Sequence, residues 1–140
     1  MERVSSQVHE WALAEAVVES VIAKSLEIGR KRFEYLRVVL GRLQQIDKDI
    51  LAYAIDQLLK LAREERGIEV GKVEFKEEEV ELHCLRCGYR WIVDLGSMDE
   101  STRESIHFVP EAIHAYVKCP RCGSHDFEIA AGRGIAIELG

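Results

Sequence analysis

Hydrophobic residues recur along the first half of the chain with two different spacings. From residue 9 to 29 they return every three or four positions, which predicts a helix. Residues 33–43 instead alternate between apolar and polar side chains, which predicts a strand. A second helix is expected over 48–66, because Asp47 can cap its start and Gly67 can end it.

The alternating pattern returns after the second helix, from Val73, and again close to the C-terminus. A strand at the C-terminus needs a partner, and the nearest candidates lie in the first half of the chain. We therefore expect an α+β fold with two domains. Residues 1–79 and 127–140 would form a small mixed domain of two helices and a three-stranded sheet, and residues 80–126 would form an inserted domain.

Two Cys-x-x-Cys-Gly motifs lie within the inserted segment. Two intervening residues let both sulfurs of a pair face one metal ion at about 2.3 Å. The glycine after each pair permits the positive φ that curls the turn around the sulfurs. Paired motifs of this kind predict a single structural zinc site, and its ligands would be Cys84, Cys87, Cys119 and Cys122.

Other uses of the cysteines are less well supported. A redox dithiol needs only one such pair in a thioredoxin-like context, which is absent here. A four-cysteine iron centre is compatible with the spacing. Four thiolates leave a zinc ion no open position for water, which argues against a zinc enzyme. Few large apolar residues lie in 80–126, so we expect zinc to supply much of the folding free energy of that segment.

Composition narrows the functional classes. The chain has 140 residues, 47% of them hydrophobic, and no apolar run near the roughly 20 residues that span a bilayer. No membrane association is expected, and the first seven residues lack the apolar core of a secretory signal, so we expect a cytoplasmic protein. The net charge of −6 weighs against nucleic-acid binding.

Histidines offer candidates for a second metal site. Imidazole suits nickel, copper or zinc, although a lone histidine is more often structural or merely exposed. His83 and His125 flank the cysteines and are expected to be polar residues near the motifs. For His114, packing and ligation are equally supported. His9 opens the first predicted helix, which by itself is a weak signal.

Several motifs taken together resemble a known family. They are the string His9-Glu-Trp-Ala-Leu-Ala, the strand Val38-Val-Leu-Gly-Arg-Leu-Gln44, both cysteine motifs and the continuation of the second one to Phe127. The chain is similar over about residues 8–139 to the hydrogenase-maturation nickel metallochaperone family HypA, in particular to its archaeal members.

This resemblance implies a nickel-binding α/β domain and a structural zinc-ribbon domain. His9 and Glu10 match the histidine and glutamate of the family's N-terminal nickel site. His107 matches a histidine that can join the nickel site in archaeal members when the GTPase partner is bound. His9, Glu10 and His107 are therefore the predicted nickel ligands.

The implied function is delivery of Ni(II) to the large-subunit precursor of a [NiFe]-hydrogenase, without catalysis by the chain itself. A HypB-like GTPase would assist, since the chain has no phosphate-binding Gly-x-x-x-x-Gly-Lys-Ser/Thr motif of its own. The expected oligomeric state is a monomer or a homodimer.

One position departs from the family pattern. The family has a chain-initiating Met directly before the histidine, whereas Val8 takes that place here. We hypothesise that the natural start is codon 8, a GUG read as methionine. N-terminal sequencing of the protein from its native host tests this, and a native chain beginning at Met1 would reject it.

The alternative is a zinc ribbon that binds nucleic acid. Residues 80–126 carry five basic and seven acidic side chains, a net charge of −2. That sign opposes contact with a phosphate backbone, so the ribbon is expected to bind no nucleic acid.

Overall fold

A computed structural model describes residues 2–43 and 46–140. These residues divide into two compact units. The first unit comprises 2–38, 46–74 and 137–140, and the second comprises 39–43 and 75–136. The elements in chain order are α1 (Glu2–Ile28), β1 (Arg32–Gly41), α2 (Lys48–Arg66), β2 (Glu69–Glu78), β3 (Val80–Cys84), β4 (Arg90–Val93), η1 (Leu95–Ser97), α3 (Glu100–Phe108), η2 (Pro110–Ala112), α4 (Ile113–Tyr116), β5 (Phe127–Ala131) and β6 (Ile135–Leu139).

Three strands form a mixed sheet in the order β2-β1-β6. Backbone hydrogen bonds join Glu69 to Lys31 at one end of the β1–β2 pair and Arg42 to Glu78 at the other, so β1 and β2 are parallel. Helix α2 makes the crossover that such a pair requires. Strand β6 runs antiparallel to β1. Gly140 is hydrogen-bonded to Glu34 and Tyr35 near the start of β1, and the Gly134 carbonyl accepts the Gly41 N–H at the end of β1.

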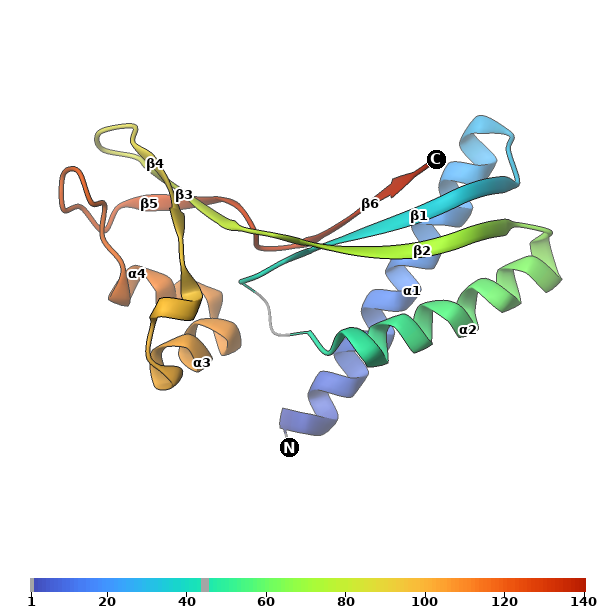
Figure 1. Ribbon diagram of the computed structural model, residues 1–140, viewed down its shortest axis with the longest axis horizontal. Coiled ribbons are helices and arrows are strands. Elements are labelled where there is room, and N and C mark those ends of the chain that lie inside the picture. Colours follow the sequence, from blue (N-terminus) through green and yellow to red (C-terminus); the bar gives the residue numbers. More distant parts are fainter. Residues whose placement is uncertain (1, 44–45) are drawn as a thin grey trace. The chain divides into compact units, whose positions relative to one another are not determined.

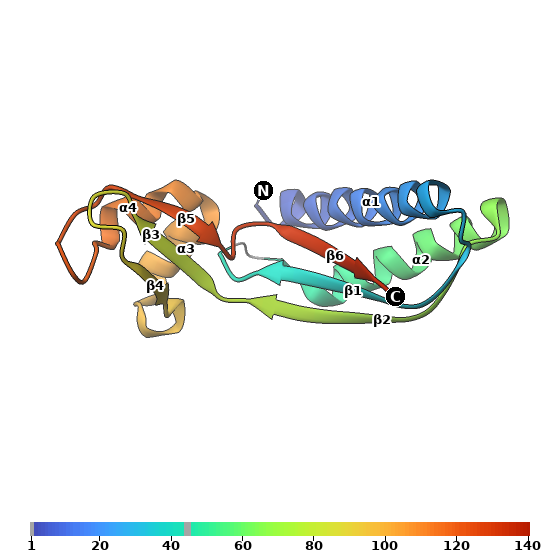
Figure 2. The ribbon, with the colours of Figure 1, turned by 90° about the horizontal axis from the view of Figure 1, so that it is seen from above.

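The first unit has its own hydrophobic core. Helices α1 and α2 lie on one face of the sheet segments of this unit (Figures 1 and 2). Both helices turn a stripe of small and branched apolar residues inward. They face the buried residues of β1, which alternate from Leu36 onward as expected of a half-buried strand. The buried set is Ala14, Val17, Val18, Val21, Phe33, Leu36, Val38, Leu51, Ala54, Ile55, Ala62 and Ile68.

Helix α2 begins and ends where its sequence predicts. The Asp47 carboxylate accepts the backbone N–H groups of Asp49 and Ile50, at 3.0 and 3.2 Å. Gly67 ends the helix in the left-handed region, with φ of 70°, and its N–H donates to the carbonyls of the last turn. Helix α1 begins at Glu2, earlier than predicted, because the helix continues beyond its apolar stripe where no Gly or Pro interrupts it.

The second unit is built on an antiparallel sheet in the order β4-β3-β5. Helices α3 and α4 lie beside this sheet (Figure 1). The sheet and the helices enclose a core that consists of Leu43, Val80, Leu82, Val93, Leu95, Ile106, Ile113 and Phe127. The segment that contains the cysteines thus has a hydrophobic core of its own, which is larger than its apolar content had led us to expect.

The fold class predicted from the sequence is confirmed: the chain is α+β, with a two-helix, three-stranded part and a second part that carries the cysteines. The predicted domain boundary at residue 127 differs from the division into units. Phe127 pairs with Cys84 in the β3–β5 ladder, so β5 belongs to the second unit, and only β6 returns to β1. In the described part of the chain, no helix is both long and apolar enough to cross a membrane.

Candidate metal centre

Two similar turns carry the four cysteines. Cys84 ends β3 and Cys87 follows in the turn toward β4, while Cys119 and Cys122 lie in the turn before β5. In both turns the glycine after the second cysteine has positive φ, 79° at residue 88 and 77° at residue 123. Its N–H donates to the carbonyl of the first cysteine, at 3.0 and 2.8 Å respectively. The glycines therefore close both turns as predicted.

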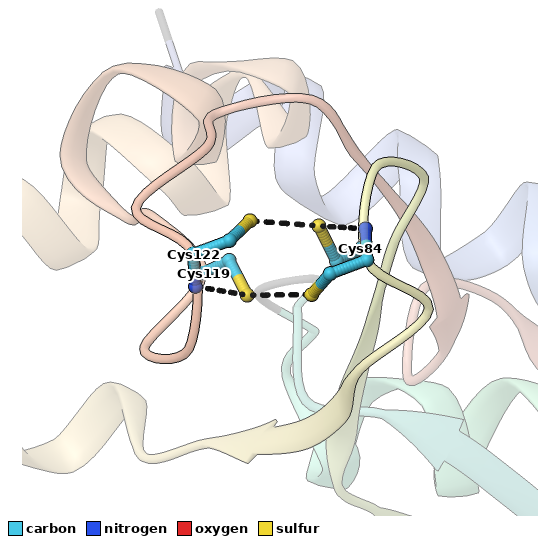
Figure 3. Close-up of side chains that lie close together, drawn as sticks. Cys84, Cys119 and Cys122 are labelled. Carbon is cyan, nitrogen blue, oxygen red and sulfur yellow. Dashed lines mark hydrogen bonds between the residues drawn. The ribbon is translucent and has the colours of Figure 1, made fainter.

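The four sulfurs converge on one point (Figure 3). All four Sγ atoms lie within 4.8 Å of one another, and the Cys84–Cys122 and Cys87–Cys119 separations are both 3.6 Å. A tetrahedral zinc ion with bonds of about 2.3 Å places its sulfurs about 3.8 Å apart. The cluster of cysteines thus fits a structural zinc site.

Backbone amides stabilise the thiolate form of two of the cysteines, which is the form that binds a metal cation. The Cys87 N–H donates to Cys84 Sγ at 3.4 Å, which lowers the pKa of the Cys84 thiol to about 6. Burial raises the pKa of Cys119, but N–H groups of Cys122 and Arg121 donate to its sulfur, and the net effect lowers that pKa. Cys84 and Cys119, the first cysteine of each motif, are buried, whereas Cys87 and Cys122 are exposed.

The thiol proton of Cys122 is harder to remove than those of Cys84 and Cys119. The Ser124 amide lowers the pKa of Cys122, yet partial desolvation of its sulfur and the three neighbouring cysteines outweigh that effect and raise the pKa to about 11. Four thiolates so close together repel one another unless a cation neutralises them. A zinc ion held by all four sulfurs would supply that charge and keep no position open for water, so its role would be to hold the two turns together.

Aromatic packing connects the metal site to the core of the second unit. Phe127 pairs with Cys84 across the β3–β5 ladder and is almost fully buried. Trp91 contacts its ring edge-on, with centroids 5.7 Å apart, and the His114 ring stacks on it at 4.3 Å. These contacts hold β5 against β3, the strand that ends at the first cysteine turn. Neither Phe127 nor Trp91 was predicted to support the site, although their place close to the cysteine motifs in the sequence is a usable signal.

Three histidines near the cysteines are engaged in the structure. His125 Nδ1 faces the carbonyls of His114 and Val117, both at 2.9 Å, which is the geometry of a donor. His114 stacks on Phe127, so its packing interpretation is the one that the contacts favour. His83 Nδ1 lies 3.1 Å from the Glu128 carboxylate on the neighbouring strand.

The predicted nickel ligands lie in different units. His9 is exposed on α1, and the adjacent Glu10 is fully buried, with its Oε2 accepting the Asp47 N–H at 2.6 Å. His107 is half-buried in the last turn of α3, and burial lowers its pKa. Across the residues that the structure describes, the cysteines are the only set of three or more potential metal-binding side chains that meet.

Comparison with known proteins agrees with this geometry. A family model described as hydrogenase/urease nickel incorporation, metallochaperone, HypA, matches residues 8–139. The hydrogenase maturation factor HypA of Thermococcus kodakarensis is 43% identical over 131 residues, covering 92% of this chain and 91% of its own. That of Pyrococcus furiosus is 42% identical over 133 residues with the same coverage.

Solved structures share the fold. The solution structure of the Ni metallochaperone HypA from Helicobacter pylori superimposes with a TM-score of 0.60 at 18% identity, covering 93% of this chain and 94% of that one. A second solution structure, of a HypA protein, gives 0.61 at 19% identity and covers 94% of both chains. On the family match and these archaeal relatives, the chain belongs to the HypA family of hydrogenase maturation factors.

Proposed function

We propose that this chain carries Ni(II) to the precursor of a [NiFe]-hydrogenase, and that zinc on the four cysteines holds its second unit together. The family match over residues 8–139 carries this proposal. The closed set of four sulfurs agrees with it, because such a centre has no open position for catalysis. Nickel, the cargo, then needs other ligands.

His9 is the proposed primary nickel ligand. Its imidazole is exposed on α1, so a metal ion can reach it without any change in the core. Backbone amides within α1 are not available to nickel in the same way, because within a helix each N–H is bonded to a carbonyl four residues earlier. Nickel binding that also used the amide of residue 8 or 9 would therefore require α1 to unwind at its start.

Glu10 supports the proposed site in another way. Its carboxylate accepts the N–H of Asp47, the residue that caps α2, and is fully buried. This contact holds the turn of α1 that carries His9 against the beginning of α2. Glu10 was predicted as a nickel ligand, but ligation by its carboxylate would require this buried hydrogen bond to break. We therefore propose that Glu10 positions His9 and contributes to nickel binding through that contact.

His107 is proposed to join the nickel site when a partner is bound. The lowered pKa keeps its imidazole neutral at physiological pH, the form that binds metals. Two partners are proposed: a GTPase that assists nickel insertion and the hydrogenase large-subunit precursor that receives the ion. The absence of a phosphate-binding loop motif in the sequence fits a GTPase that is a separate protein.

Nickel titration by calorimetry tests the assignment. His9→Ala is expected to abolish specific nickel binding while zinc content and helical content stay unchanged. His83→Ala is the matched control, since it removes an imidazole from the second unit and is expected to leave nickel affinity as it was. Equal affinity in His9→Ala and the unaltered chain would reject His9 as a ligand.

Two further measurements refine the test. The titration is repeated on a form that starts with Met in place of Val8, where a free amine adjoins His9, and nickel is expected to bind that form more tightly. His107→Ala is expected to weaken nickel handling chiefly with the GTPase present. An unchanged result in the partner complex would remove His107 from the site.

The nucleic-acid alternative has its own test. The net charge of −2 over residues 80–126 argues against it. Binding to duplex DNA or RNA that weakens steeply with added salt would favour it over the metallochaperone.

A further inference from the structure

A surface cleft of about 580 Å³ lies in the first unit, away from any residue discussed as a metal ligand. It forms where the connection from α1 to β1 meets the connection from α2 to β2, and Figure 1 shows both connections at the same end of the helices. The Glu69 N–H donates to the Lys31 carbonyl at 2.8 Å and ties the two connections together. Three arginines line the cleft, in a chain with a net charge of −6.

Two of these arginines are held in place by their own contacts. The Arg30 guanidinium lies 4.9 Å above the centre of the Phe33 ring, and its Nε donates to the Arg32 carbonyl at 2.8 Å. The Nε of Arg32 in turn donates to the Glu69 carboxylate at 2.9 Å. Within the described residues, the terminal Nη groups of both side chains take part in no hydrogen bond or ion pair.

Arg63 is the third arginine of the cleft. It lies in the last turn of α2, and its guanidinium has no hydrogen bond or ion pair to any residue that the structure describes. Two carboxylates also line the cleft, those of Glu69, which is paired with Arg32, and Glu34. The three guanidinium groups thus outnumber the carboxylates.

Guanidinium groups with free Nη edges suit one kind of ligand. They bind planar or tetrahedral oxyanions through two parallel N–H···O bonds. Arg30 is already held over the Phe33 ring and needs little ordering to do so, whereas Arg63 would be ordered by the ligand itself. We propose that this cleft binds a small oxyanion ligand, a phosphate or carboxylate compound, through Arg30 and Arg63, with Arg32 at its edge.

Arg63 could also serve only to stabilise the end of α2, and Arg66 provides the control for that role. Basic residues in the last turn of a helix interact favourably with its dipole, and both Arg63 and Arg66 occupy that turn of α2. Arg66 does not line the cleft. If the charge served only the helix, the two arginines would be equivalent.

The test is an NMR titration of the full-length, zinc-loaded chain with inorganic phosphate and, separately, with citrate at low ionic strength. Saturable shifts are expected for backbone amides lining the cleft, with chloride at matched ionic strength producing none. Arg63→Gln is expected to weaken binding by about tenfold, as for the loss of one charge-assisted hydrogen bond. Arg66→Gln is expected to change it by less than about twofold.

Each outcome decides the proposal. Saturation by phosphate, by citrate or by both supports it and identifies which oxyanion is preferred. An equal loss of oxyanion affinity in Arg63→Gln and Arg66→Gln would mean that binding depends only on the overall positive charge, and this would overturn the proposal. The absence of saturable shifts with either ligand would overturn it as well.

Discussion

His9 and Glu10 are neighbours in the chain but have opposite environments. The His9 imidazole is exposed, whereas the Glu10 carboxylate is fully buried and accepts the N–H of Asp47. A buried carboxylate is tolerated only where hydrogen bonds replace its lost hydration. Two adjacent positions of α1 thus carry an exposed imidazole, which is our proposed nickel ligand, and a buried carboxylate that joins α1 to the start of α2.

The four cysteines also differ from one another. The Cys87 amide lowers the pKa of Cys84 to about 6, so Cys84 is a thiolate at neutral pH even before metal binds. Cys122, with its pKa raised to about 11, still carries its proton there. The metal-free site is thus partly deprotonated, and zinc must displace the protons that remain.

Zinc uptake at about pH 7 is therefore expected to release at least one proton, that of Cys122. The apparent zinc affinity should fall as the pH is lowered, and more steeply below about pH 6, where Cys84 is protonated as well. Calorimetry in two buffers that differ in ionisation enthalpy measures the proton count. A binding enthalpy that does not depend on the buffer would contradict this expectation.

At the scale of the elements, glycine makes the bend between β5 and β6 feasible. Gly132 has a φ of 92°, and a side chain on it would lie 2.6 Å from the Glu79 carbonyl oxygen. Its N–H donates to the Glu78 carboxylate at 2.8 Å and its carbonyl accepts the Leu43 N–H at 2.9 Å. The end of β5 is therefore packed backbone against backbone where β2 gives way to β3.

Gly132→Ala is expected to destabilise the second unit by roughly 1–3 kcal/mol, through the strained φ and the contact with Glu79. Gly134→Ala is the control, because no atom lies within 4 Å of its would-be side chain and its φ is not positive. It should change stability by less than about 0.5 kcal/mol. Urea unfolding followed by Trp91 fluorescence, in a Trp11→Phe background, measures both, and equal effects would refute the close approach.

At the scale of the whole molecule, each unit has its own means of staying folded. The first unit buries apolar stripes of α1 and α2 against β1 and has no cysteine. The second unit combines a buried apolar core with the four-sulfur cluster. Removing zinc should therefore act on one unit and spare the other.

Hydrogen exchange before and after chelation of zinc checks this expectation. Amides in the two cysteine turns and in β3 and β5 should exchange faster once the metal is gone, since zinc holds the turns that end and precede these strands. Amides of α1 and α2 should keep their protection. A uniform loss of protection along the chain would mean that the first unit depends on the metal too.

The sequence by itself determined the features whose information is local. Asp47 and Gly67 bound α2 because capping depends on side chains within one turn of the helix end. The cysteine motifs fixed the two metal-binding turns, because two intervening residues and a trailing glycine define the turn. The same motifs, taken with the first helix, were sufficient to indicate the family.

Only the tertiary structure decided which distant segments meet. Residues 127–131 alternate like any half-buried strand, and nothing in that pattern says that β5 pairs with β3 rather than with β1. The burial of Glu10 against the start of α2, and the gathering of Arg30 and Arg63 on one cleft, likewise depend on contacts between residues far apart in the sequence. Local patterns set backbone conformation, whereas the choice among partners depends on packing and hydrogen bonding that exist only once the chain has folded.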